Sequence, residues 1–172
     1  KGVTLKGNSK EAYKLIKDMG DEPAFLNYQP AGSDYPYPAT LCVSVNDEIV
    51  HGIPGPRKLV EGDIVGLDIG LIRQGVVVDM AATVGVGKIS EKDQRLIENT
   101  KEALMRGVDE VRVGNRVGDI GFSIEGYLKP IGYGIVRDLG GHGVGRHVHE
   151  EPFVPNFGKR GSGPSIALGE VL

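Results

Sequence analysis

The chain has 172 residues, of which 40% are hydrophobic and 25% charged, and its formal net charge is −3. This composition excludes an intrinsically disordered chain and a strongly basic nucleic-acid-binding surface. No apolar run approaches the roughly 20 residues of a membrane helix, no signal peptide begins the chain, and the single Cys42 leaves no internal disulfide. We therefore expect one soluble, cytoplasmic domain over residues 1–172.

The first part of the chain predicts a helix followed by short strands. Apolar residues at helical spacing predict the helix over residues 9–19. A loop rich in Pro, Gly and Tyr follows over residues 29–40. The apolar run 41–45 predicts a strand, and residues 46–48 predict a turn that leads into a return strand over 49–51.

Two long apolar runs in the middle of the chain, residues 64–72 and 76–82, predict a β-hairpin. They are joined by Arg73-Gln74-Gly75, a short polar turn with the glycine that a hairpin needs where φ is positive. The position of this turn fixes the register of the hairpin, and a one-residue slip would reverse every side chain.

The second half predicts two helices and a further strand. Ser90 and Asp93 form a capping box that begins a helix, and Pro130 closes a helix over residues 117–128. The first helix stops before Gly114, and its apolar stripe is Ile97, Leu104, Val108 and Val111. Residues 132–136 predict the start of a strand. This order of elements predicts an α+β fold in which helices cover one face of a largely antiparallel sheet.

Two aspartates, Asp68 and Asp79, lie inside the apolar runs of the hairpin. A turn centred on residues 73–74 makes them direct partners, and a turn on residues 74–75 pairs Asp79 with Gly70, so both even-length registers place the carboxylates on one face. Like charges roughly 5 to 8 Å apart at Cβ repel unless a cation joins them. The alternatives are an odd-length loop that separates them, or separate structural roles as a cap residue and an arginine partner.

Four histidines occur outside the predicted helices. His142 lies between glycines, which offer an imidazole little to pack against but allow a ligand to come close. His51 precedes Gly-Ile-Pro-Gly, and His149 precedes Glu-Glu-Pro. His147, next to Arg146, is expected to be a solvated residue. Carboxylates with an imidazole and no thiolate suit Mn, Fe, Co or Zn, and two such ions would suit hydrolysis.

These motifs, in this order, resemble the type I methionine aminopeptidases of the pita-bread family. The segments that carry the resemblance are 45–54, 62–68, 75–79, 141–145 and 149–152, and the match is weaker before Leu41. The resemblance implies the pita-bread fold and removal of the initiator methionine from nascent polypeptides, by a metal-bridged hydroxide that attacks the first peptide bond. The His-Gly-Ile-Pro segment separates the chain from X-Pro peptidases of the same fold.

The resemblance also implies a role for each candidate site residue. Asp68, Asp79 and His142 would be ligands of two divalent metal ions, whose identity among Co, Mn, Fe and Zn the sequence leaves open. His51 and His149 would be catalytic and would contact the substrate. Tyr37 and Cys42 match positions that line the methionine side-chain pocket, whereas Val148 stands where many members carry an aromatic residue.

Two further implications concern partners and completeness. The expected partners are nascent polypeptide N-termini and the ribosome, with no nucleic-acid substrate and no membrane, and the expected state is a monomer. Family members continue beyond Leu172 into segments that supply two glutamate ligands, so the chain is expected to be truncated at both ends and to have little activity by itself. The alternatives are an X-Pro peptidase and a catalytically silent family member that binds protein or RNA.

Overall fold

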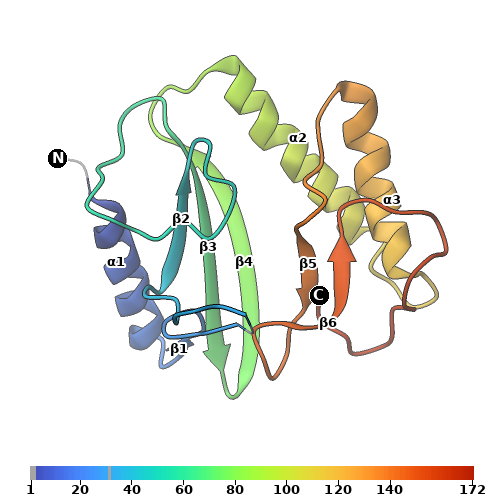
Figure 1. The fold of residues 1–172 in the computed structure, drawn as a ribbon, viewed down its shortest axis with the longest axis horizontal. Helices are drawn as coiled ribbons and strands as arrows, with labels where there is room; N and C mark the ends of the chain where they lie inside the picture. The colour runs from blue at the N-terminus through green and yellow to red at the C-terminus, as the bar shows by residue number, and fades with distance from the viewer. Residues whose placement is uncertain (1–2, 31) are drawn as a thin grey trace. The chain divides into compact units, whose positions relative to one another are not determined.

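The computed structural model describes residues 3–30 and 32–172, which form two compact units. Unit 1 extends to Gln94 and also contains Gly145–Val148. Unit 2 comprises Arg95–Val144 and His149–Leu172. The helices and strands of both units are labelled in Figure 1.

The sheet of unit 1 is antiparallel throughout and is organised around one long strand. Its members are β1 (Glu22–Pro23), β2 (Leu41–Val45), β3 (Ile64–Arg73) and β4 (Val76–Gly85). Strand β3 pairs with β4 along one edge and with both β1 and β2 along the other. The predicted strand 41–45 and the predicted hairpin are confirmed, although both hairpin strands extend further than predicted (Figure 1).

The hairpin turn consists of two residues, Gln74 and Gly75. Arg73 is the cross-strand partner of Val76, and the φ angles of Gln74 and Gly75 are 52° and 79°. Positive φ at both central residues is the geometry of the type I′ turn, which matches the right-handed twist of paired strands. Of the two predicted registers, the structure therefore has the one whose turn lies on residues 74–75.

Helix α1 (Leu5–Asp18) covers one face of the unit 1 sheet. It begins four residues before the predicted start because Thr4 caps it, accepting a hydrogen bond from the Gly7 amide at 3.0 Å. Ser9, at the predicted start, is buried instead and accepts a hydrogen bond from the Thr40 amide. The core between helix and sheet contains Leu5, Ala12, Leu41, Val43, Val45 and Val65.

The predicted return strand over residues 49–51 is absent from the described structure. The carboxylate of Glu48 accepts a hydrogen bond from the Val45 amide at 2.7 Å, so a side chain takes up the donor that a pairing strand would use. Asn46 and His51 both have positive φ, which a β-strand does not allow. The segment is therefore an anchored loop.

Unit 2 pairs two helices with a two-stranded sheet. Helix α2 (Glu91–Val108) begins at the predicted cap, where the Asp93 amide donates to Ser90 Oγ at 3.1 Å. Helix α3 (Val117–Leu128) has the predicted bounds and leads into the 3₁₀ turn η1 (Lys129–Ile131). Strands β5 (Gly140–Gly143) and β6 (Glu150–Pro155) are antiparallel. The buried core comprises Ala103, Val117, Ile120, Ile124, Val154 and Ile166.

Three predictions in this unit are wrong. Helix α2 ends at Val108 and does not continue to the residues before Gly114. The buried residues of α2 are Ala103 and Gly107, whereas Leu104 and Val108 of the predicted stripe are 55% and 48% exposed. Small residues face α3 because the helices approach closely: a Cβ on Gly107 would lie 2.9 Å from Ile124 Cδ1. Residues 132–136 are not a strand, since the amides of Gly132 and Tyr133 are used to close the end of the preceding helices.

In the part of the chain that the structure describes, no helix is both long and apolar enough to cross a membrane.

Candidate metal centre

Asp68 and Asp79 lie on the same face of the β3–β4 hairpin. Asp79 is the cross-strand partner of Gly70, two positions from Asp68 along β3. Cys42 on β2 is the direct partner of Asp68. Both carboxylates are partly buried, and the Phe25 ring packs over Gly70, the glycine opposite Asp79.

The two carboxylates interact strongly in the metal-free chain. Burial of Asp68, followed by the nearby charge of Asp79 and a hydrogen bond with its carboxyl group, raises the pKa of Asp68 from 3.8 to about 7. The pair therefore holds a proton under conditions in which isolated aspartates are fully ionised. A divalent cation can replace that proton and neutralise both charges, so this donor set fits a metal ion.

An apolar wall lies beside the carboxylates in unit 1. Its buried members are Ala24, Phe25, Cys42, Val77 and Val148, with Tyr28, Tyr37 and Ile72 packed against them. Burial raises the pKa of the Cys42 thiol to about 11, and the charges of Asp68 and Asp79 act in the same direction. Cys42 is therefore a neutral thiol at physiological pH and can line an apolar pocket next to the carboxylates.

Tyr37 connects this wall to the loop that carries His51. Its hydroxyl donates to the Gly52 carbonyl at 2.9 Å, and a side-chain hydrogen bond joins it to Cys42. Burial raises the pKa of Tyr37 well above its usual range, so the hydroxyl keeps its proton and acts as a donor. The side chain of His51 is exposed.

His142 and His149 come together in unit 2. Their ring centroids are 4.4 Å apart, with the rings inclined at 61°. His142 Nδ1 lies 2.9 Å from the Gly143 carbonyl oxygen, which accepts a hydrogen bond when that nitrogen carries the proton. In this tautomer Nε2 is the nitrogen that carries the lone pair, and a backbone partner of this kind is typical of histidines that bind metals.

The predicted site residues thus form two groups. Asp68, Asp79, Cys42, Tyr37 and His51 belong to unit 1, and His142 and His149 to unit 2. Among residues 3–30 and 32–172, no group of three or more His, Cys, Asp or Glu side chains has the arrangement of a metal site. Arg146 and His147 are exposed, as predicted for a solvated pair.

Three participants were not predicted from the sequence. Phe25 and Val77 lie in the apolar wall, and Ser44 Oγ accepts a hydrogen bond from the Gly52 amide at 3.1 Å. The close approach of Phe25 depends on Gly70, where a Cβ would lie 2.5 Å from the Phe25 ring. The sequence could have pointed to Ser44, because a hydroxyl within the apolar run 41–45 is expected to be buried and a buried hydroxyl requires a hydrogen-bond partner.

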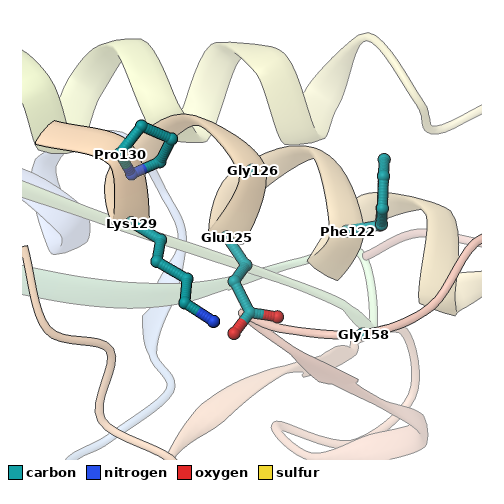
Figure 2. A pocket seen from close by; sticks show the side chains of 6 residues that line it. All are labelled: Phe122, Glu125, Gly126, Lys129, Pro130 and Gly158. Carbon is teal, nitrogen blue, oxygen red and sulfur yellow. The ribbon is translucent and has the colours of Figure 1, made fainter.

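Unit 2 also contains a cavity of about 340 Å³. Figure 2 shows the side chains of Glu125 and Lys129 extending from the helix in the same direction. Glu125 forms an ion pair with Arg137 at 3.0 Å. The lining residues are Phe122, Glu125, Gly126, Lys129, Pro130 and Gly158, none of which is a predicted site residue.

The partly buried carboxylate pair, the paired imidazoles and the antiparallel α+β architecture are features of a metallopeptidase. The chain belongs to metallopeptidase family M24, whose model matches residues 1–172.

Sequence and structure comparisons identify methionine aminopeptidases as similar proteins. The one from Clostridium acetobutylicum is 42% identical over 172 residues, which cover 99% of this chain and 66% of that protein. The one from Aquifex aeolicus is 48% identical over 166 residues, 94% of this chain and 64% of that protein. The chain therefore spans slightly less than two thirds of the length of these relatives.

The fold prediction is confirmed by a solved structure. The crystal structure of methionine aminopeptidase from Rickettsia prowazekii matches with a TM-score of 0.92 and 36% sequence identity, covering 98% of this chain and 66% of that one. This likeness confirms the predicted pita-bread fold, and the relatives confirm the resemblance to methionine aminopeptidases.

Proposed function

We propose that the protein carrying this sequence is a methionine aminopeptidase, which hydrolyses the first peptide bond of polypeptides that begin with methionine. The observation that carries this proposal is the pair Asp68 and Asp79, held on one face of a hairpin whose register is fixed by a two-residue turn. Relatives with that name, at 42% and 48% identity, support the choice of reaction.

We propose Asp68, Asp79 and His142 as ligands of two divalent ions, drawn from Co, Mn, Fe and Zn. When bound, such ions supply an activated water and stabilise the negative charge that develops during peptide hydrolysis. The fit rests on the donor set. Two carboxylates that share a proton in the metal-free chain favour a divalent cation, and a hydrogen bond from imidazole Nδ1 to a backbone carbonyl is typical of histidines that bind metals.

The remaining predicted residues are proposed to bind substrate. Tyr37 and Cys42 belong to an apolar wall next to the carboxylates, which suits the unbranched, polarisable side chain of methionine. His51 is proposed to contact the backbone of the substrate beside the scissile bond. His149, whose ring lies 4.4 Å from that of His142, is proposed to hydrogen-bond the oxygen that becomes negatively charged during the reaction.

The biological setting follows from the proposed reaction. The substrates would be the N-termini of nascent polypeptides in the cytoplasm, with the ribosome as a partner and with no nucleic-acid substrate. We propose that residues 1–172 belong to one catalytic domain of a monomeric enzyme.

The test uses the gene product that contains this sequence. We expect it to release methionine from the peptide Met-Gly-Met when Mn²⁺ or Co²⁺ is added, and to lose this activity with a chelator. Asp79→Ala should lower kcat by at least about 100-fold and reduce the metal stoichiometry, since even second-shell changes cost up to that factor. Asp47→Ala, at an exposed turn position, is the matched control.

Three results would reject the proposal. Unchanged turnover in Asp79→Ala would remove the metal assignment. Faster hydrolysis of Gly-Pro than of Met-Gly-Met would identify an X-Pro peptidase. Tight binding of metal without hydrolysis of either peptide would identify a catalytically silent binding protein.

A further inference from the structure

Gly52, directly after His51, is held by three hydrogen bonds from two segments of unit 1. Its amide donates to Ser44 Oγ at 3.1 Å. Its carbonyl oxygen accepts from the Val43 amide and from the Tyr37 hydroxyl, both at 2.9 Å. Together, these contacts of Tyr37, Val43 and Ser44 with Gly52 are called the Gly52 clamp.

The clamp holds the backbone of Gly52 in close contact with the backbone of β2. A Cβ on Gly52 would lie 2.3 Å from the Val43 carbonyl oxygen, a separation that real Cβ atoms do not show. Only glycine permits this approach, which explains why a glycine follows the histidine. The loop therefore rests directly on the backbone of β2.

The residue that precedes the clamp has an uncommon backbone conformation. His51 has a φ of 59°, in the left-handed region that residues other than glycine rarely adopt unless their surroundings hold them there. The other end of the loop is anchored too: Asn46, with a φ of 58°, donates to Asp63 Oδ1 at 2.9 Å and accepts from the Ile64 amide at 3.0 Å. His51 is thus fixed between two anchors.

The polar groups of the clamp are difficult to explain by packing alone. Ser44 is 6% exposed and stands in a strand whose other members are Leu, Cys and Val. A buried hydroxyl costs stability unless it is hydrogen-bonded, and its bond is to Gly52. The Tyr37 hydroxyl is likewise committed to Gly52, while its ring packs against the apolar wall.

We propose that Tyr37 and Ser44 are positioning residues for His51. By fixing Gly52 on β2 they hold the backbone from which the imidazole reaches the substrate. This inference rests on the proposed function of His51, and it divides the role of Tyr37: the ring lines the methionine pocket, whereas the hydroxyl holds the His51 loop and is not available to the substrate.

A double-mutant cycle with the full gene product tests the proposal. Tyr37→Phe keeps the ring and removes the hydroxyl, so kcat/KM for Met-Gly-Met should fall by about tenfold, the factor that one ordinary hydrogen bond can contribute. In a His51→Ala background the same change should have little further effect, because the group that it positions is gone. Tyr35→Phe is the matched control and should leave activity unchanged, because Tyr35 is 60% exposed.

A second measurement does not depend on activity. Hydrogen exchange of the Gly52 amide should accelerate by up to about tenfold in Tyr37→Phe and in Ser44→Ala, and not in Tyr35→Phe. Unchanged exchange in both variants would overturn the clamp, even if the enzyme proves to have another substrate. An equal fall in kcat/KM with and without His51 would overturn the positioning role, and an inactive wild-type protein with the expected exchange would reject the proposed function alone.

Discussion

The carboxylate pair makes the stability of the metal-free protein depend on pH in a direction that can be tested. Burial first, then the charge and hydrogen bond of Asp79, raises the pKa of Asp68 from 3.8 to about 7 in the folded chain. A group with a raised pKa stabilises the fold fully below the unfolded value, and this contribution is lost as the pH rises towards the folded value. The pair should therefore weaken the metal-free fold between about pH 4 and pH 7.

The magnitude follows from the size of the change in pKa. A rise from 3.8 to about 7 corresponds to roughly 4 kcal/mol, at about 1.36 kcal/mol for each pKa unit. Asp68 is only partly buried, so solvent screening reduces this figure to about 2 kcal/mol. Burial is the largest cause of the raised pKa of Asp68, and it persists when Asp79 is replaced. We therefore expect Asp79→Asn to remove about half of this loss of stability, which is about 1 kcal/mol.

Urea unfolding at pH 5 and pH 8, in the presence of a chelator, measures this difference. The free energy of unfolding should fall less between the two pH values in Asp79→Asn than in the wild-type protein. Asp47→Asn, at an exposed position of a turn, controls for the loss of one negative charge and should follow the wild type. If Asp79→Asn loses as much stability as the wild type over this interval, the two carboxylates are not coupled and the reasoning is refuted.

Three further results are expected. At pH 8, Mn²⁺ at about 100 times its Kd should raise the thermal midpoint by roughly 5–10 °C, and a similar rise in Asp79→Asn would contradict the ligand assignment. Gly52→Ala should cost about 1–3 kcal/mol in urea unfolding, because its Cβ would lie 2.3 Å from a main-chain oxygen, whereas Gly55→Ala meets nothing within 4 Å and should be neutral. On α3, Gly121→Ala should destabilise the protein for the same steric reason. Gly126 is exposed and has nothing near its Cβ position, so Gly126→Ala should stabilise the protein by up to about 1 kcal/mol. If the two variants of either pair had equal effects on stability, these close contacts would not limit the packing.

The elements that the sequence predicts correctly are those specified by local signals. The run 41–45 is a strand because its β-branched and apolar residues are buried on both faces. The bounds of α3 follow from an apolar stripe that ends before Pro130. The hairpin follows from two apolar runs joined by Gln74-Gly75, and its register follows from the turn.

The errors arise where a particular contact decides the outcome and the apolar pattern does not show it. Residues 49–51 have strand-forming side chains, but the Glu48 carboxylate occupies the backbone donor that a return strand would need. The exposed positions of Leu104 and Val108 reflect a helix contact made through Ala103 and Gly107, which a hydrophobic stripe does not reveal. The first contact is local and the second is tertiary, and the apolar pattern of the segment contains neither.

The same distinction applies to the candidate site. Asp68 and Asp79 are identifiable because carboxylates in apolar strands are costly, and an even-length turn places both on one face. Phe25 and Val77 are not identifiable, since ordinary core residues in separate segments give no sign that they share a wall with Cys42. Two glycines indicate such contacts indirectly, because Gly52 and Gly70 stand where another part of the chain comes within reach of a Cβ.

The carboxylate pair links stability and metal affinity through the same geometry. The two-residue turn fixes Asp79 two positions from Asp68 before any ion arrives, so the repulsion between them is built into the folded state. A bound cation relieves this repulsion and therefore restores the stability that the metal-free fold loses as the pH rises towards 7. Metal affinity should therefore rise with pH up to about 7 and change little beyond it, because above that value no proton competes for Asp68.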